Sequence, residues 1–249
     1  MSLTPRLQDF DHGGFWHPAT DHLSFYCLIP KNGSSWISHV LRHNGWTQGV
    51  LEHCPNQHIN ELIVVLRDPV ERWIAGIAQY FSSYVLHSHW YDRTEFSQGY
   101  HGNYIPGKPN YEGPFVTGQQ FIDNYNEVTE RLLFEQIAFD DHTQEQSWFV
   151  DHFKADTHTW FYLDQSFEQT FLYNFRDMNM TAPPVPDYNR GQDNEHVRLI
   201  CNFLKERIAS RPYLKHALER YYRRDYKMIE SADFKWFSPE ELNSNNESR

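Results

Sequence analysis

The residue types that can hold a phosphate occur together in one short stretch, Pro30, Lys31, Asn32, Gly33, Ser34, Ser35 and Trp36. A glycine lets the backbone approach an anion, and serine hydroxyls and first-turn amides at a helix N-terminus can donate hydrogen bonds to it. Lys31 adds a mobile positive charge. The stretch follows an apolar run at residues 23–29 and precedes a segment with helical spacing. We therefore predict a phosphate-binding turn.

A second cationic motif, Arg67-Asp68-Pro69-Val70-Glu71-Arg72, follows another apolar run at residues 62–66. Open α/β sheets bind ligands at the carboxyl ends of their strands, so we expect Arg67 to face the same crevice as Lys31. A guanidinium fork suits a terminal phosphate, and we expect the charged residues after Arg67 to pair locally and hold the turn. The alternative is that Arg67 and Asp68 only cap a helix.

Taken in this order, the two motifs resemble those of the PAPS-dependent sulfotransferases, whose donor is 3′-phosphoadenosine 5′-phosphosulfate (PAPS). Residues 30–36 are similar to that family's 5′-phosphosulfate loop. Residues 67–72 are similar to its 3′-phosphate element, most closely in the carbohydrate-sulfotransferase branch. Weaker similarities to the same branch occur at Asp141-His142, Glu145-Gln146-Ser147, Asn189-Arg190 and Asp225-Tyr226-Lys227, so that the resemblance spans most of residues 23–230.

The resemblance implies an enzyme that moves a sulfuryl group from PAPS to a hydroxyl or amine without a metal. It implies donor binding by Lys31, Asn32, Gly33, Ser34, Ser35, Trp36, Arg67 and Arg190. One position departs from the family pattern. Members usually carry a serine that contacts the 3′-phosphate eight residues after the arginine of the second motif, and this chain has Ala75 there. The 3′-phosphate site could therefore be weaker, be completed by another residue, or serve a slightly different nucleotide, with Arg67 as its principal residue.

Transfer to a hydroxyl is helped by a group that removes its proton, and histidine suits neutral pH. Many family members place a catalytic histidine or glutamate between the two nucleotide motifs, an interval that here contains His39, Glu52, His53, His58 and Glu61. His39 lies on the predicted first helix and is interpreted as structural. His53 follows the short run Val50-Leu51, which we expect to be a strand ending at the same crevice. His53 is thus the first candidate for the base and His58 the second, with a solvated loop histidine as the alternative for each.

Other reactive residues support weaker hypotheses. The groups His53, Cys54, His58 and His87, His89, His101 do not match a zinc-ligand spacing, so we predict no metal. Cys54 could instead be a reactive thiol, and His142 could orient substrate or pack in the core. An ATP-dependent kinase is disfavoured, because Gly33 is followed by neither the second glycine nor the Lys-Ser or Lys-Thr pair of a nucleoside-triphosphate loop.

These motifs require strands that end at one edge and helices that begin there. Apolar runs predict strands at residues 23–29, 62–66 and 160–163, and helical spacing appears at 36–41, 70–81, 121–137, 148–153, 167–175, 194–209 and 213–231. Strand-to-helix units imply a parallel sheet. We predict an α/β fold of three layers, similar to P-loop proteins, in which helices flank a central parallel sheet.

The 249 residues are interpreted as a single domain, with an N-terminal arm at residues 1–20 and a polar, disordered tail at 239–249. A proline-rich stretch at 183–186 predicts an extended connector. Residues 87–117 mix aromatic residues with Gly, Asn, His and Gln and lack periodicity, which is typical of a substrate lid loop. The alternative is that its aromatic residues pack the loop onto the domain. A neutral saccharide, a small hydroxylated metabolite and a tyrosine-bearing peptide are all compatible acceptors.

Composition limits the partners. Asp and Glu number 33 against 22 Lys and Arg, a formal net charge of −11, which argues against a general binder of nucleic acid or anionic membrane. Three cysteines and the absence of an apolar leader predict a reducing, cytoplasmic location, and the sequence predicts no oligomeric state. The leading hypothesis is a sulfotransferase acting on a small-molecule or saccharide acceptor. The alternative is a non-catalytic nucleotide-binding protein that keeps the same fold.

Overall fold

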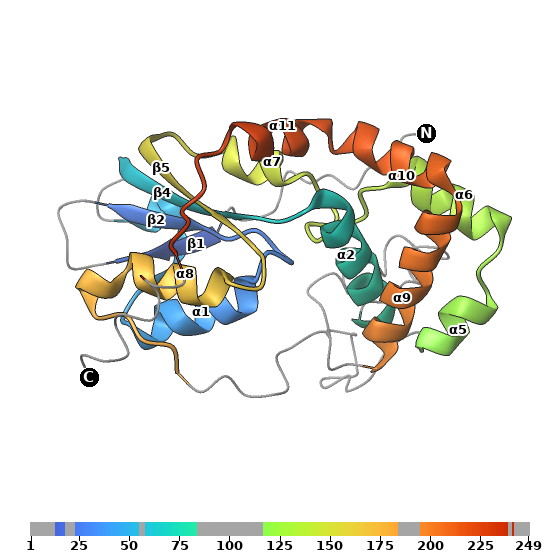
Figure 1. The fold of residues 1–249 in the computed structure, drawn as a ribbon, viewed down its shortest axis with the longest axis horizontal. Helices are drawn as coiled ribbons and strands as arrows, with labels where there is room; N and C mark the ends of the chain where they lie inside the picture. The colour runs from blue at the N-terminus through green and yellow to red at the C-terminus, as the bar shows by residue number, and fades with distance from the viewer. Residues whose placement is uncertain are drawn as a thin grey trace. The chain divides into compact units, whose positions relative to one another are not determined.

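The computed structural model describes residues 13–17, 23–54, 58–83, 117–183, 195–238 and 241 (Figure 1). The strands are β1 (Gly13–Trp16), β2 (Ser24–Cys27), β3 (Thr47–Val50), β4 (Ile59–Leu66) and β5 (Ala155–Tyr162). The α-helices are α1 (Ser34–His43), α2 (Pro69–Ser83), α5 (Gly118–Asp123), α6 (Glu127–Gln136), α7 (Gln146–Val150), α8 (Phe167–Asn174), α9 (Glu195–Ser210), α10 (Pro212–Tyr221) and α11 (Arg223–Ser231). Two 3₁₀ turns, η2 (Leu51–His53) and η3 (Arg176–Met178), complete the described elements.

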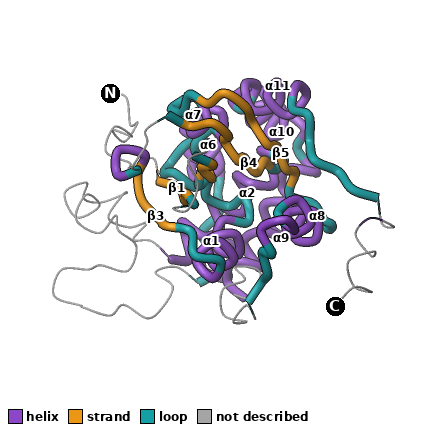
Figure 2. The backbone as a smooth tube through the Cα atoms, turned by 90° about the vertical axis from the view of Figure 1, so that its left-hand side faces the viewer, coloured by secondary structure: helices purple, strands orange, loops and turns teal. Residues whose placement is uncertain are grey.

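The five strands form one sheet in the order β3-β1-β2-β4-β5 (Figure 2, orange). β2, β4 and β5 are parallel to one another, whereas β1 pairs antiparallel with both β2 and β3. The prediction of a parallel sheet is therefore correct for its centre and wrong for its β1 and β3 side. The four residues of β1 carry two glycines and lie in the predicted N-terminal arm, so they give too short an apolar run to indicate a strand.

Helices cover both faces of this sheet. Figure 1 shows α1 and α8 on one face, where side chains that include Phe15, Tyr26 and Phe161 belong to the same core cluster as residues of these helices. On the other face, side chains that include Phe25 and Leu62 pack against α7 and α11. β4 has continuous buried residues from Leu62 to Leu66 because both faces are covered. The α/β arrangement with a central sheet between helices is thus confirmed.

Two predicted helices are interrupted. Residues 121–137 form α5 and α6, because the Asn126 side chain accepts hydrogen bonds from the amides of Val128 and Thr129 and so begins a new helix. Residues 213–231 form α10 and α11, which are separated at Tyr222. The other predicted helices are present with boundaries that differ by a few residues.

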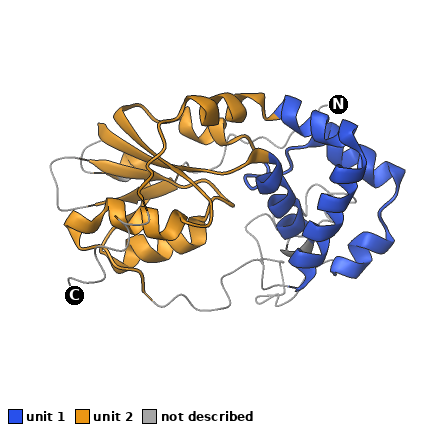
Figure 3. Cartoon of the chain, in the orientation of Figure 1, with its two compact units in different colours: residues 1–5, 70–143, 187–221 blue, residues 6–69, 144–186, 222–249 orange. Residues whose placement is uncertain are grey.

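Close packing divides the chain into two compact units (Figure 3). Unit 2 comprises residues 6–69, 144–186 and 222–249 and holds the sheet with α1, α7, α8 and α11. Unit 1 comprises residues 1–5, 70–143 and 187–221 and holds nearly all of α2 together with α5, α6, α9 and α10. The chain passes from one unit to the other after Pro5, Pro69, Thr143, Pro186 and Tyr221, so neither unit is a continuous segment. The single-domain interpretation stays a prediction.

Several predicted features lie outside the described residues. These are the first twelve residues of the N-terminal arm, the lid loop up to residue 116, Arg190, most of the 183–186 connector and nearly all of the tail. The aromatic loop insertion and the role of Arg190 therefore stay predictions.

Candidate functional site

The predicted phosphate-binding turn joins β2 to α1. Lys31 and Gly33 both adopt left-handed backbone conformations, with φ of 68° and 74°. Glycine adopts this conformation freely, whereas a lysine there costs about 1 kcal/mol or more. α1 begins at Ser34, its N-cap residue Gly33 has no side chain to cap the first amides, and its first turn has no acidic residue. The turn thus presents a strained cationic residue beside helix amides that can still accept an anion.

Arg67 reaches this turn from the end of β4. β2 and β4 pair in parallel, so their carboxyl ends lie at the same edge of the sheet. The Arg67 guanidinium donates a hydrogen bond from Nη1 to the carbonyl oxygen of Lys31 at 3.2 Å. The two cationic motifs that the sequence predicted to share an edge are therefore in direct contact.

The Asn32 side chain fixes the turn through hydrogen bonds to the protein interior. Its side chain is fully buried, and Nδ2 donates to the Val65 carbonyl oxygen at 2.7 Å and to Gln146 Oε1 at 2.6 Å. Its Oδ1 is a buried acceptor with no hydrogen-bond partner among the described residues. The sequence assigned Asn32 to donor binding. In the structure its amide donors point into the protein, so its side chain orders the turn and its contribution to an anion site is indirect.

Gln146, the first residue of α7, contacts both motifs. Its Oε1 accepts from the Arg67 amide at 3.0 Å as well as from Asn32, and its Nε2 donates to the Arg67 carbonyl oxygen at 2.9 Å. The sequence showed Gln146 only as part of a segment similar to the sulfotransferases. Spacing could not assign it a place in the site, because Arg67 and Asn32 lie 79 and 114 residues before it.

The residues after Arg67 pair mainly with distant partners. Tyr226 on α11 donates its hydroxyl to Asp68 Oδ2 at 3.4 Å. Glu71 forms an ion pair with Lys205 at 2.8 Å, and the buried Arg72 donates to the Asp141 carbonyl oxygen at 2.8 Å. These contacts are long-range, and the local pairing expected among Asp68, Glu71 and Arg72 stays a prediction. Ala75 lies half-buried on α2 and has no polar side-chain atom to offer an anion.

His53, the first candidate base, follows β3, which ends at the same edge of the sheet as β2 and β4. β3 runs in the direction of β2, because β1 is antiparallel to both. Val50 pairs with Gly13, and Gly14 pairs with Cys27, so β3 and β2 end at the same level. The strand expected at Val50-Leu51 is thus present at Thr47–Val50, while Leu51 already belongs to the 3₁₀ turn that follows. The 3₁₀ turn with Glu52 and His53 follows directly, while the side chain of His53 lies outside the described part of the structure.

His58 lies at the other edge of the sheet. It directly precedes β4, is exposed, and pairs with Asp156 at 2.9 Å near the start of β5. Nine residues of extended chain at about 3.3 Å each separate it from Arg67 by about 30 Å. His58 is thus too far from Arg67 to act on a donor bound there, and its place before the apolar run at residues 62–66 already puts it at the amino end of that strand. His39 lies on α1, as predicted.

A second cluster of ionisable residues lies in unit 1. The His142 Nδ1 lies 3.0 Å from Asp140 Oδ2 and 2.8 Å from Asp141 Oδ1. Burial alone would lower the pKa of His142, but the two carboxylates outweigh it and raise this pKa to about 9. One ligand atom from each of the three residues lies within 4.8 Å of the others, a spacing that could hold a cation. A metal ligand must be a neutral imidazole, however, and these contacts favour the protonated one.

Cys54 is buried after η2. Burial, with a smaller contribution from Glu52, raises the pKa of its thiol to about 11. Only the thiolate is nucleophilic, so this environment argues against the reactive thiol considered from the sequence.

A comparison of the chain with models of protein families, with curated proteins and with solved structures finds no significant match. Among the described residues, no helix has both the length and the apolar character needed to cross a membrane.

Proposed function

We propose that the protein is a PAPS-dependent sulfotransferase with a P-loop-like donor site at the carboxyl edge of its sheet. The observation that carries this proposal is the contact between Arg67 Nη1 and the Lys31 carbonyl oxygen, 3.2 Å, at the uncapped start of α1. Two cationic residues and a set of helix amides thereby converge on one small region. The order of the two motifs in the sequence favours PAPS over other anionic ligands.

In the proposed site, Lys31, Ser34, Ser35 and the first amides of α1 hold the 5′-phosphosulfate, and Arg67 holds the 3′-phosphate. The acceptor oxygen attacks sulfur, the bond from sulfur to the 5′-phosphate oxygen breaks, and His53 takes the acceptor proton. The products are a sulfate ester and adenosine 3′,5′-bisphosphate. Lys31 and the helix amides stabilise the negative charge that develops on the leaving phosphate.

Sulfate transfer from ³⁵S-labelled PAPS to a panel of saccharide and hydroxylated acceptors tests this proposal. We expect Lys31→Ala to lower transfer by about 100-fold, as is typical when a group that stabilises transition-state charge is removed. Lys154→Ala is the matched control. Lys154 is an exposed lysine directly before β5, at the opposite edge of the same sheet, so its removal should change transfer less than about twofold.

The same variants separate an enzyme from a non-catalytic nucleotide-binding protein. Calorimetry with adenosine 3′,5′-bisphosphate should show binding that Arg67→Ala weakens by about tenfold or more, because a charge-assisted contact to phosphate is lost. Binding by the wild-type protein without transfer to any acceptor would favour the non-catalytic alternative, suggested by Ala75. Absence of binding would refute both.

A further inference from the structure

The parallel pairing of β2 with β4 stops before β4 ends. The register runs from Ser24 with Glu61 to Tyr26 with Ile63, whereas β4 continues to pair with β5 as far as Leu66 and Tyr162. The end of β4 therefore needs other partners on its β2 side. Two side-chain amides provide them, because Asn32 donates to the Val65 carbonyl oxygen and Gln146 bonds both the amide and the carbonyl oxygen of Arg67.

Gln146 is the residue that connects the two turns. Its Oε1 accepts simultaneously from Asn32 Nδ2 at 2.6 Å and from the Arg67 amide at 3.0 Å. The two-point bond to Arg67 imitates a strand residue and fixes the backbone from which the guanidinium extends. One buried side chain thus bonds both the Lys31 turn and the backbone of Arg67.

Asp225 on α11 holds Gln146 in this orientation. Its carboxylate is fully buried and accepts from the amides of Gln146 and Ser147, both at 2.8 Å. Its Oδ2 also lies 3.5 Å from Gln146 Nε2. Because the Asp225 carboxylate only accepts hydrogen bonds, the side-chain nitrogen of Gln146 must face Asp225. The side-chain oxygen of Gln146 therefore faces Asn32 and the Arg67 amide.

We propose that Gln146 is a positioning residue that couples the two anion-binding turns, so that a ligand with anions at both ends binds them as one site. This inference rests on the proposed donor site. Two other bonds also join these turns, from Asn32 to the Val65 carbonyl oxygen and from Arg67 to the Lys31 carbonyl oxygen, so neither turn loses all its support without Gln146. Loss of Gln146 should therefore misalign the turns relative to each other more than it disturbs either one.

Gln146→Met tests the coupling, because methionine is similar in length and lacks both polar groups. Binding of adenosine 3′,5′-bisphosphate, adenosine 5′-monophosphate and adenosine 3′-monophosphate is measured by calorimetry. The bisphosphate needs both turns in register, and each monophosphate needs one. We expect the variant to weaken bisphosphate binding by about tenfold or more, and to weaken each monophosphate by less than about threefold.

Asn44→Leu is the matched control within the same unit. Asn44, like Gln146, is a side-chain amide with several bonds to backbone, since it donates to the Val40 and Thr181 carbonyl oxygens and accepts from the Thr181 amide. It is half-buried, whereas Gln146 is fully buried. It caps the far end of α1, about 15 Å from the Lys31 turn at about 1.5 Å per residue. Its loss should lower thermal stability while leaving all three affinities within about twofold of wild type.

The outcomes separate the two proposals. If the wild-type protein does not bind the bisphosphate, the donor-site proposal fails and this inference fails with it. If the wild type binds and a folded Gln146→Met variant loses nothing, or loses affinity equally for all three nucleotides, only the coupling role is refuted. Should Gln146→Met not fold, Gln146→Glu replaces it. That side chain has the same shape but turns an oxygen toward the Arg67 carbonyl, and the same selective loss is expected.

Discussion

Replacing His142 with glutamine should remove a pH-dependent part of the stability of unit 1. Glutamine can still donate to one of the two carboxylates, but it cannot carry the positive charge that they stabilise. The folded protein holds His142 between Asp140 and Asp141, and its pKa is raised from 6.5 to about 9. A group whose pKa is higher in the folded than in the unfolded protein stabilises the fold fully at a pH below its pKa in the unfolded state. This stabilisation is lost as the pH rises through its pKa in the folded state.

The size of this contribution follows from the two pKa values. A difference of one between the folded and unfolded pKa is worth about 1.36 kcal/mol, so the protonated histidine adds about 3 kcal/mol at pH 6 and less than about 0.5 kcal/mol at pH 9. The difference in the free energy of unfolding between wild type and His142→Gln should therefore shrink by about 3 kcal/mol over this range. His142 is mostly buried, so solvent screens its ion pairs little.

Urea unfolding at pH 6, 7, 8 and 9 measures this difference, and His58→Gln provides the control. His58 also faces a carboxylate, Asp156 at 2.9 Å, but both side chains are more than half exposed. An exposed pair contributes little, so the corresponding difference for His58→Gln should stay below about 0.5 kcal/mol. The reasoning is refuted if the His142→Gln difference does not change with pH, or if both variants show the same dependence.

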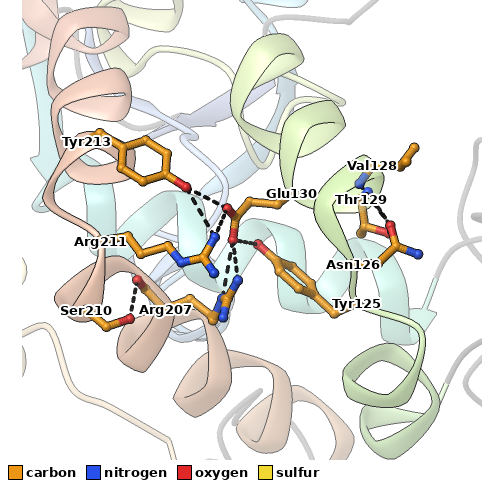
Figure 4. A network of polar contacts seen from close by, with 9 residues as sticks. All are labelled: Tyr125, Asn126, Val128, Thr129, Glu130, Arg207, Ser210, Arg211 and Tyr213. Carbon is orange, nitrogen blue, oxygen red and sulfur yellow. Dashed lines mark hydrogen bonds and ion pairs between the residues drawn. The ribbon is translucent and has the colours of Figure 1, made fainter.

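Two further predictions concern other buried groups. Glu130 on α6 accepts hydrogen bonds from Arg207, Arg211 and Tyr213 (Figure 4). Glu130→Gln should therefore lower the free energy of unfolding by about 1–2 kcal/mol in thermal unfolding. The control is Glu135→Gln on the same helix, which should cost less than about 0.5 kcal/mol because Glu135 is exposed. Equal costs would contradict this. At pH 7.5 a thiol reagent should modify Cys54 about 100-fold more slowly than a free cysteine, since raising its pKa from 9 to about 11 removes most of the thiolate; rapid modification of native Cys54 would contradict its burial.

The central elements could be predicted because their signals are local. β4 and α2 follow from a continuous apolar run and a helical repeat that begins at a proline, and the structure contains both. β1 could not be predicted, because only its pairing with β2 and β3 makes its four residues a strand. The division of residues 121–137 depends on Asn126, whose role as a helix cap competes with the longer apolar pattern.

Part of the candidate site could likewise be predicted from local sequence patterns, and part could not. The Lys31 turn and Arg67 could be placed at one edge from the rule that parallel strands end together, and their contact agrees with that expectation. His58 precedes the apolar run at residues 62–66, so the order of residues already places it at the end of β4 opposite Arg67. Gln146 and Asp225 enter the site through bonds that join residues 79 positions apart, which no local pattern indicates.

The hydrogen bonds of Gln146 and Asp225 can form only late in synthesis, because they join residues far apart in the sequence. Asn32 and Arg67 leave the ribosome early, but the residue that aligns them follows Asn32 by 114 positions, and the carboxylate that orients it comes another 79 later. A nascent chain that ends before Asp225 would carry both cationic turns without the bonds that align them. Because contacts so distant in sequence form slowly, the anion-binding edge should be among the last parts of the sheet to become rigid. If the proposed donor binds at this edge, it would stabilise finished molecules and leave incomplete ones unprotected.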